Sequence, residues 1–131
     1  MNIPEIKKVK LEEYDIEIDS YLTYAQVQQI VNSALHCENW AERQQTIDML
    51  MLYHATNISL EELEKVGHDT LLKSGIIKAV QDNIKNYYQI LQGIDFYNSW
   101  IKVLSDIVKQ MPSTMEKIQK LVVSRYAKSE K

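Results

Sequence analysis

The sequence contains few of the residues that interrupt or cross-link a chain. It has three glycines, two prolines and one cysteine in 131 residues. Turns and loops depend on glycine and proline more than on other residues, so their scarcity predicts a chain of helices with few breaks. A single cysteine excludes an internal disulfide framework, and it cannot supply a Cys-rich zinc or iron–sulfur site.

The sequence also lacks a strong charge excess and long hydrophobic runs. Fifteen Lys and Arg residues oppose 18 Asp and Glu residues, which gives a net charge of −3, and this balance does not favour nucleic acid as a partner. No apolar run approaches the roughly 20 residues that a membrane span needs, and the first residues lack the apolar segment of a secretory signal. We therefore expect a soluble domain that does not associate with membranes.

Helix starts are marked by a repeated local signal. In a capping box, Ser, Thr, Asn or Asp precedes the helix and Glu or Gln follows three residues later, so that each satisfies a free backbone N–H of the first turn. Four such pairs precede apolar-periodic segments: Thr23 with Gln26, Asn39 with Glu42, Ser59 with Glu62, and Ser113 with Glu116.

These signals and the apolar periodicity predict about six helices. The predicted ranges are 24–36, 40–55, 60–66, 74–93, the segment after Asp95 up to Pro112, and the segment from Thr114 onwards. Because about three residues separate the last three helices, we expect them to form an antiparallel series.

The first 20 residues follow a different pattern. Apolar residues alternate with charged ones on either side of Glu12 and Glu13, where the alternation slips by one residue. A period of two is typical of a strand, and a lone strand cannot satisfy its own backbone groups. Two alternatives are open: an extended arm that meets another subunit or protein, and a local β-hairpin.

The fold class that follows is mainly α, a single-domain bundle of about six helices with an N-terminal extended arm or short hairpin. The predicted organisation is an arm or strands over residues 1–20, a helical domain over 21–127 and a charged tail over 128–131.

The histidines offer no recognisable catalytic or metal-binding pattern. His36 and Cys37 are adjacent and would need two further metal ligands, and His54 follows an apolar helical segment. His68 and Asp69 resemble part of a catalytic pair, but no nucleophile accompanies them. We expect no enzyme activity, no catalytic residue, no cofactor and no metal; His54, His68 and Asp69 are the first residues to mutate if activity is found.

One carboxylate, Asp48, lies in an otherwise apolar segment. It could lie at the exposed edge of its helix, one turn from Gln44 and Gln45. If it is buried it needs a partner, for which Arg43 or a lysine could serve.

The aromatic residues gather in two places, near the start of the first helix and around Gly93. Tyr and Trp combine an apolar body with a polar tip and are enriched at protein interfaces. Core packing is the alternative role for both groups. Together with the apolar residues of the N-terminal segment, they give the candidate protein interface: Tyr14, Ile16, Ile18, Tyr21, Tyr24, Phe96, Tyr97 and Trp100.

Several short sequence elements between residues 20 and 95 are similar to those of a known group of proteins. They are YLTY at 21–24, IVN at 30–32, WAER at 40–43, Y-x-A-T at 53–56 and L-x-K-S-G at 71–75. In these elements the chain resembles small, mostly uncharacterised helical proteins of tailed bacteriophages that infect Gram-positive bacteria. The resemblance implies a phage-encoded helical protein, of a kind often found among virion and morphogenesis genes, and it carries no catalytic residues.

The expected function is a non-enzymatic one that depends on protein–protein contacts. We expect a small virion component or an assembly factor, which binds copies of itself or a phage structural protein, in the host cytoplasm during infection or in the virion. The alternative is a phage-encoded inhibitor or adaptor that binds a host or defence protein.

Overall fold

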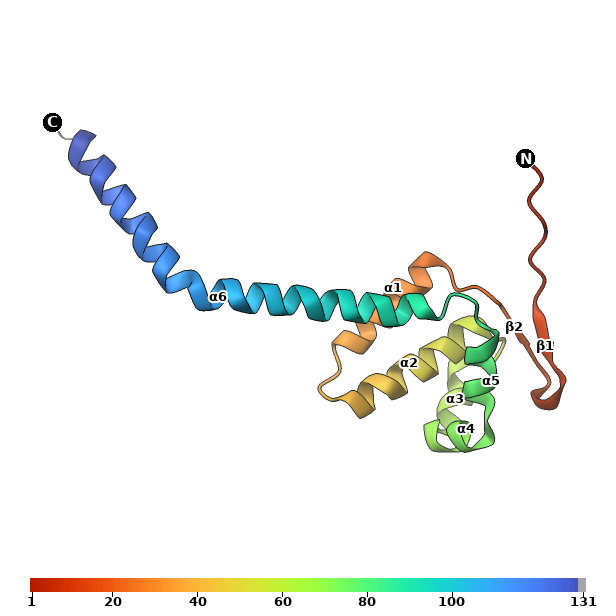
Figure 1. Ribbon diagram of the computed structural model, residues 1–131. Helices are drawn as coiled ribbons and strands as arrows, with labels where there is room; N and C mark the ends of the chain where they lie inside the picture. Colours follow the sequence, from red (N-terminus) through yellow and green to blue (C-terminus); the bar gives the residue numbers. More distant parts are fainter. Residues whose placement is uncertain (130–131) are drawn as a thin grey trace. The chain divides into compact units, whose positions relative to one another are not determined.

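The chain folds into a mainly α-helical bundle with an N-terminal β-hairpin, as predicted. The computed structural model describes the backbone of residues 1–129 and the side chains of 1–113 and 115–123 (Figure 1). Helices contain 72% of the residues. The chain divides into two compact units, residues 1–94 and 95–131, and not into an arm followed by one helical domain over 21–127. Of the predicted tail, residues 130 and 131 lie outside the described residues.

The N-terminal segment forms a short antiparallel hairpin. Strand β1 (Val9–Leu11) pairs with strand β2 (Ile16–Ile18), and Lys10 lies opposite Glu17 at the centre of the register. A 3-10 helix, η1 (Glu12–Tyr14), and Asp15 in the left-handed conformation (φ 52°) connect the two strands. The slip in the alternation at Glu12 and Glu13 is therefore the turn of this hairpin.

Strand β2 belongs to the core of the first unit. Ile16 is 6% exposed and Ile18 is fully buried. Beyond the strand, the Asp19 N–H donates to the carbonyl of Ala55 (2.8 Å), and Ile18 forms a β-bridge with Thr56. Of the two sequence-based alternatives, the structure has the local hairpin, because its second strand packs within its own chain.

Helices α1 (Tyr24–Leu35), α2 (Trp40–Ala55) and α3 (Leu60–Val66) begin at the predicted caps. Thr23 and Gln26 form a complete capping box, and the side chains of Asn39 and Ser59 each accept from a backbone N–H of the following helix. The fourth predicted box, at Ser113, is wrong because that residue lies inside a longer helix.

The single helix predicted over residues 74–93 is wrong, because the helical backbone is interrupted twice, at Gly75 and over residues 84–87. Helix α4 (His68–Ser74) ends at Gly75, whose φ of 84° is left-handed and favours glycine. Helix α5 (Ile76–Asn83) follows directly and stops at Ile84, which is extended.

The second break is held by hydrogen bonds to the segment that follows β2. The Lys85 N–H donates to the Ser20 carbonyl (2.7 Å). The buried Asn86 side chain accepts from the Leu22 N–H and donates to the Leu22 carbonyl, both at 2.9 Å. These long-range bonds favour an extended backbone over a continuing helix.

Helix α6 (Tyr88–Ser129) runs through Gly93 and Pro112, so the predicted turn and stop at these residues, and the antiparallel series, are wrong. Gly93 serves close packing: a Cβ at this position would lie 2.8 Å from Cγ2 of Val31 on α1. Pro112 removes one backbone hydrogen bond, and the ribbon bends in the blue part of α6, which contains it (Figure 1).

The core of the first unit draws on the hairpin and on each of its helices. It comprises buried aliphatic side chains, of which the largest that are fully buried are Ile18, Ile30, Met51, Leu52, Leu63, Val80 and Ile90. Three polar residues are buried with them: Ser20, Asp48 and Asn86. The core therefore includes an N-terminal strand as well as the helices.

The burial of β2 predicts a large effect of truncation at Ile18. We expect Ile18→Ala to lower the free energy of unfolding by about 2–5 kcal/mol, because it leaves a cavity in the core. The control Glu17→Ala removes the exposed neighbour and should change it by less than about 0.5 kcal/mol. Urea unfolding followed by circular dichroism measures both, and equal small effects would show that β2 does not support the helices.

Candidate functional site

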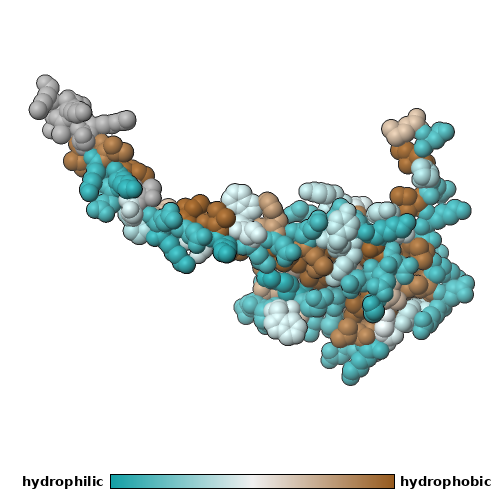
Figure 2. All heavy atoms as spheres, in the orientation of Figure 1, coloured by the Kyte–Doolittle hydropathy of each residue, from teal (hydrophilic) through white to brown (hydrophobic). Residues whose placement is uncertain are grey.

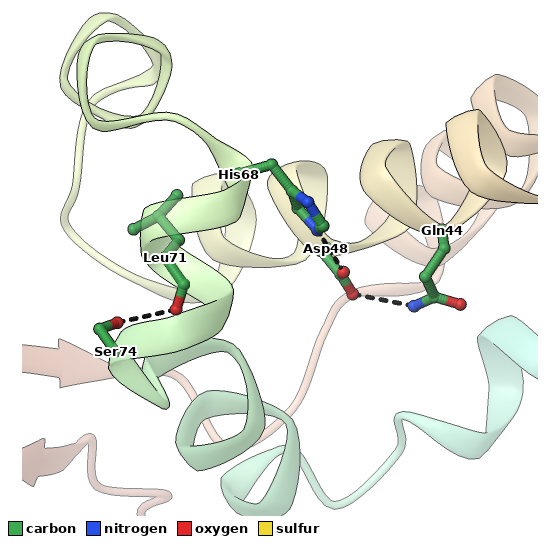
Figure 3. Close-up of polar contacts among 5 residues, drawn as sticks. All are labelled: Gln44, Asp48, His68, Leu71 and Ser74. Atoms are coloured by element: carbon green, nitrogen blue, oxygen red, sulfur yellow. Dashed lines mark hydrogen bonds and ion pairs between the residues drawn. The ribbon is translucent and has the colours of Figure 1, made fainter.

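The buried carboxylate of Asp48 is paired with a histidine from another helix. Asp48 lies on α2 and is 2% exposed. Its Oδ2 lies 2.8 Å from Nε2 of His68, the first residue of α4, and its Oδ1 accepts from the side-chain amide of Gln44 (3.0 Å). Figure 3 shows both side chains pointing at the carboxylate. The partner is thus neither Arg43, whose Nε donates to the Ala34 carbonyl, nor a lysine.

In this arrangement one ring nitrogen of His68 is engaged and the other is buried. Nε2 faces Asp48, and Nδ1 is buried without a hydrogen-bond partner. The neighbouring Asp69 is exposed, so the structure does not bring the predicted His68–Asp69 pair together. A cleft of about 390 Å³ lies beside the pair, yet both carboxylate oxygens of Asp48 already have a partner. The geometry is that of a contact that fastens α4 to α2.

The same carboxylate acts on a tyrosine that precedes α6. Burial, and next the negative charge of Asp48, raise the pKa of the Tyr87 hydroxyl above 10, while a hydrogen bond with Gln44 lowers it. The net shift favours the protonated hydroxyl. Asp48 therefore organises a polar cluster that joins three separate parts of the first unit.

The other candidates for chemistry are separate from this cluster. Nε2 of His54 is buried and unpaired, and burial lowers the pKa of this histidine. Nδ1 of His36 lies 2.7 Å from the Asn32 carbonyl, while the Cys37 thiol contacts Thr46 (3.2 Å). In the described part of the chain, no group of three His, Cys, Asp or Glu residues could hold a metal ion.

The N-terminal half of the predicted interface is divided between core and surface. Ile16 and Ile18 are buried, so they have no surface to offer a partner. Tyr14 is half-buried, and its hydroxyl donates to the Ser74 carbonyl (2.8 Å). Tyr21 and Tyr24 are exposed, and the ammonium of Lys85 lies 5.7 Å from the Tyr21 ring centre. These five residues therefore do not form one surface.

The C-terminal half of the predicted interface is exposed on α6. Phe96, Tyr97 and Trp100 are each 45–66% exposed. Tyr97 and Trp100 belong to a longer set of large apolar side chains on the same helix. We call this set the α6 face: Tyr97, Trp100, Ile101, Leu104, Ile107, Val108, Met111, Met115, Ile118, Leu121 and Val122. Each is between 45% and 64% exposed.

The sequence-based prediction divided this segment between two helices of an antiparallel series, with a break at Pro112. The helix continues through Pro112, so neither half covers the other. Every described side chain of residues 95–123 is exposed, and Figure 2 shows brown, hydrophobic residues where Figure 1 has the blue part of α6.

Comparison with other proteins adds no identification. No protein-family model, no curated protein and no solved structure matches this chain. Among the described residues, no helix is long and apolar enough to cross a membrane. The candidate site is therefore defined by its own geometry, as an exposed apolar face of one helix.

The Asp48–His68 contact predicts strong coupling between the two residues. We expect Asp48→Ala to lower the free energy of unfolding by about 2–3 kcal/mol, because it removes a charge-assisted hydrogen bond and strands a buried imidazole. Adding His68→Ala should cost little more, since the contact is already lost. The control Asp69→Ala should cost at most about 1 kcal/mol. Additive effects of Asp48→Ala and His68→Ala in urea unfolding would contradict this coupling.

Burial of His54 predicts a pH dependence of stability. Its pKa is lower in the folded chain than in the unfolded chain, so between the two values the unfolded state binds more protons. The free energy of unfolding should therefore fall as the pH drops from about 7 to 5. We expect His54→Gln to reduce this slope relative to the unaltered chain. An unchanged slope in this variant, measured by urea unfolding at each pH, would refute the role of His54.

Proposed function

We propose that this chain is a non-enzymatic protein of a tailed bacteriophage that acts through protein–protein contacts. Its role is that of a small virion component or an assembly factor. The observation that carries the proposal is the α6 face, which presents large apolar side chains from Tyr97 to Val122 to solvent. Folded monomers rarely expose contiguous apolar surface on this scale, and such surface is typical of interaction sites.

Two further observations support this function. The short sequence elements between residues 20 and 95 resemble those of phage helical proteins, which is the reason to place the chain in a phage particle or its assembly. The histidine that most resembled a catalytic group, His68, is held by Asp48 between two helices, which supports a structural role for it. The chain accordingly acts in the host cytoplasm during infection or as part of the virion.

The test is to find the chain during phage infection. Lysates are fractionated by sedimentation into washed virions, assembly intermediates and free proteins, and each fraction is analysed by mass spectrometry. We expect the chain in virions or in intermediates together with phage structural proteins. Recovery only among free proteins, or only with host proteins, would overturn the assembly role and favour an inhibitor of a host or defence protein.

A further inference from the structure

The α6 face contains a regular repeat of apolar residues along its centre. One row consists of Ile101, Val108, Met115 and Val122, spaced seven residues apart, and a second row consists of Tyr97, Leu104, Met111 and Ile118. The two rows alternate at spacings of four and three residues. This is the a and d pattern of a heptad repeat, by which helices pack side by side as a coiled coil.

The repeat is sustained over the length that a coiled coil needs. Residues 97–122 lie within one continuous helix and cover almost four heptads, about 39 Å at 1.5 Å per residue. Three to four heptads are the usual threshold for recognising a coiled coil. Pro112 follows Met111 directly and occupies an e position, so it leaves both apolar rows complete.

The charges of this segment all lie away from the two rows. Asp95, Lys102, Asp106, Lys109, Glu116, Lys117 and Lys120 occupy b, c or f positions of the heptad. The g positions that flank the rows include Trp100, Ile107 and Leu121, and no e or g position is charged. A face without charged side chains has no group that could form an ion pair with an acidic or basic partner. A second copy of the same face, by contrast, meets it without repulsion between like charges.

We propose that residues 97–122 form a coiled coil with the same segment of a second copy of this chain. The proposal rests on the proposed function, in which the α6 face binds a protein, and it identifies that protein as a second copy of this chain. Each copy supplies one heptad stripe, which is incomplete alone because its knobs need the holes of another helix. Ile90 and Ile94, which precede the stripe at the same spacing, are buried in the first unit, so self-association uses the exposed part from Tyr97 onwards.

The test compares two double variants that differ in the helix face that they change. Leu104→Lys with Val122→Lys places lysines in the apolar rows, whereas Val103→Lys with Val123→Lys places them at the neighbouring c and b positions. Leu104 and Val103 are 50% and 49% exposed, and Val122 and Val123 are 52% and 67% exposed, so none of the four lysines replaces a side chain that is buried in the single chain. Circular dichroism checks that the first unit stays folded in each variant.

Sedimentation equilibrium of the full chain measures the association. We expect the unaltered chain and the Val103/Val123 variant to sediment as a multiple of 15.3 kDa. The Leu104/Val122 variant should associate at least about 100-fold more weakly, because its lysines are buried without partners. A monomeric unaltered chain at about 0.1 mM, or an equal effect of both variants, would overturn the proposal.

The outcomes also separate this proposal from the proposed function. A chain that is monomeric on its own, yet is recovered with phage structural proteins, refutes pairing with a second copy and leaves the assembly role in place. A chain that self-associates through the α6 face, yet is recovered only with host proteins, refutes the assembly role and leaves the coiled coil in place.

Discussion

The first unit depends on the backbone pairing of the segment from Ile16 to Leu22. Strand β2 pairs with β1 on one side, the Asp19 N–H binds the end of α2, and Leu22 is bound at both its N–H and its carbonyl by Asn86. Since the side chains of Ile16 and Ile18 are buried, the same segment also fills the core. This N-terminal segment thus holds in place residues that follow it in the sequence by 36 to 65 positions, because buried backbone N–H and carbonyl groups need hydrogen-bond partners.

A buried charge adds a second constraint on the same unit. Asp48 is almost fully buried, and a carboxylate in such a place is costly unless it is paired and hydrogen-bonded. His68 and Gln44 supply both contacts, which explains why the short helix α4 is held against α2. The apolar core tolerates small shifts of a helix, whereas this contact requires one position of His68 to within a few tenths of an ångström.

The sequence-based predictions were most accurate for features that depend on interactions between residues close in the sequence. The bounds of α2 and α3 agree with the prediction because their caps act within one turn. The break after Asn83 could not be predicted, since it depends on hydrogen bonds to Ser20 and Leu22 across the chain. Gly93 was predicted to mark the end of a helix, whereas in the structure its lack of a side chain allows close contact with Val31. In the candidate interface, Phe96, Tyr97 and Trp100 are exposed, whereas the burial of Ile16 and Ile18 follows from a core that pattern alone does not reveal.

The hairpin described above has one open edge. In the described part of the chain the sheet contains two strands, so the outer edge of β1 has no strand beside it, and such an edge can template a strand from a neighbouring molecule. Two features limit such growth: β1 is three residues long, and Lys10 within it and Lys7 shortly before it add positive charge. A neighbour that approached this edge would bring the same lysines. The edge is therefore protected against sheet-like aggregation.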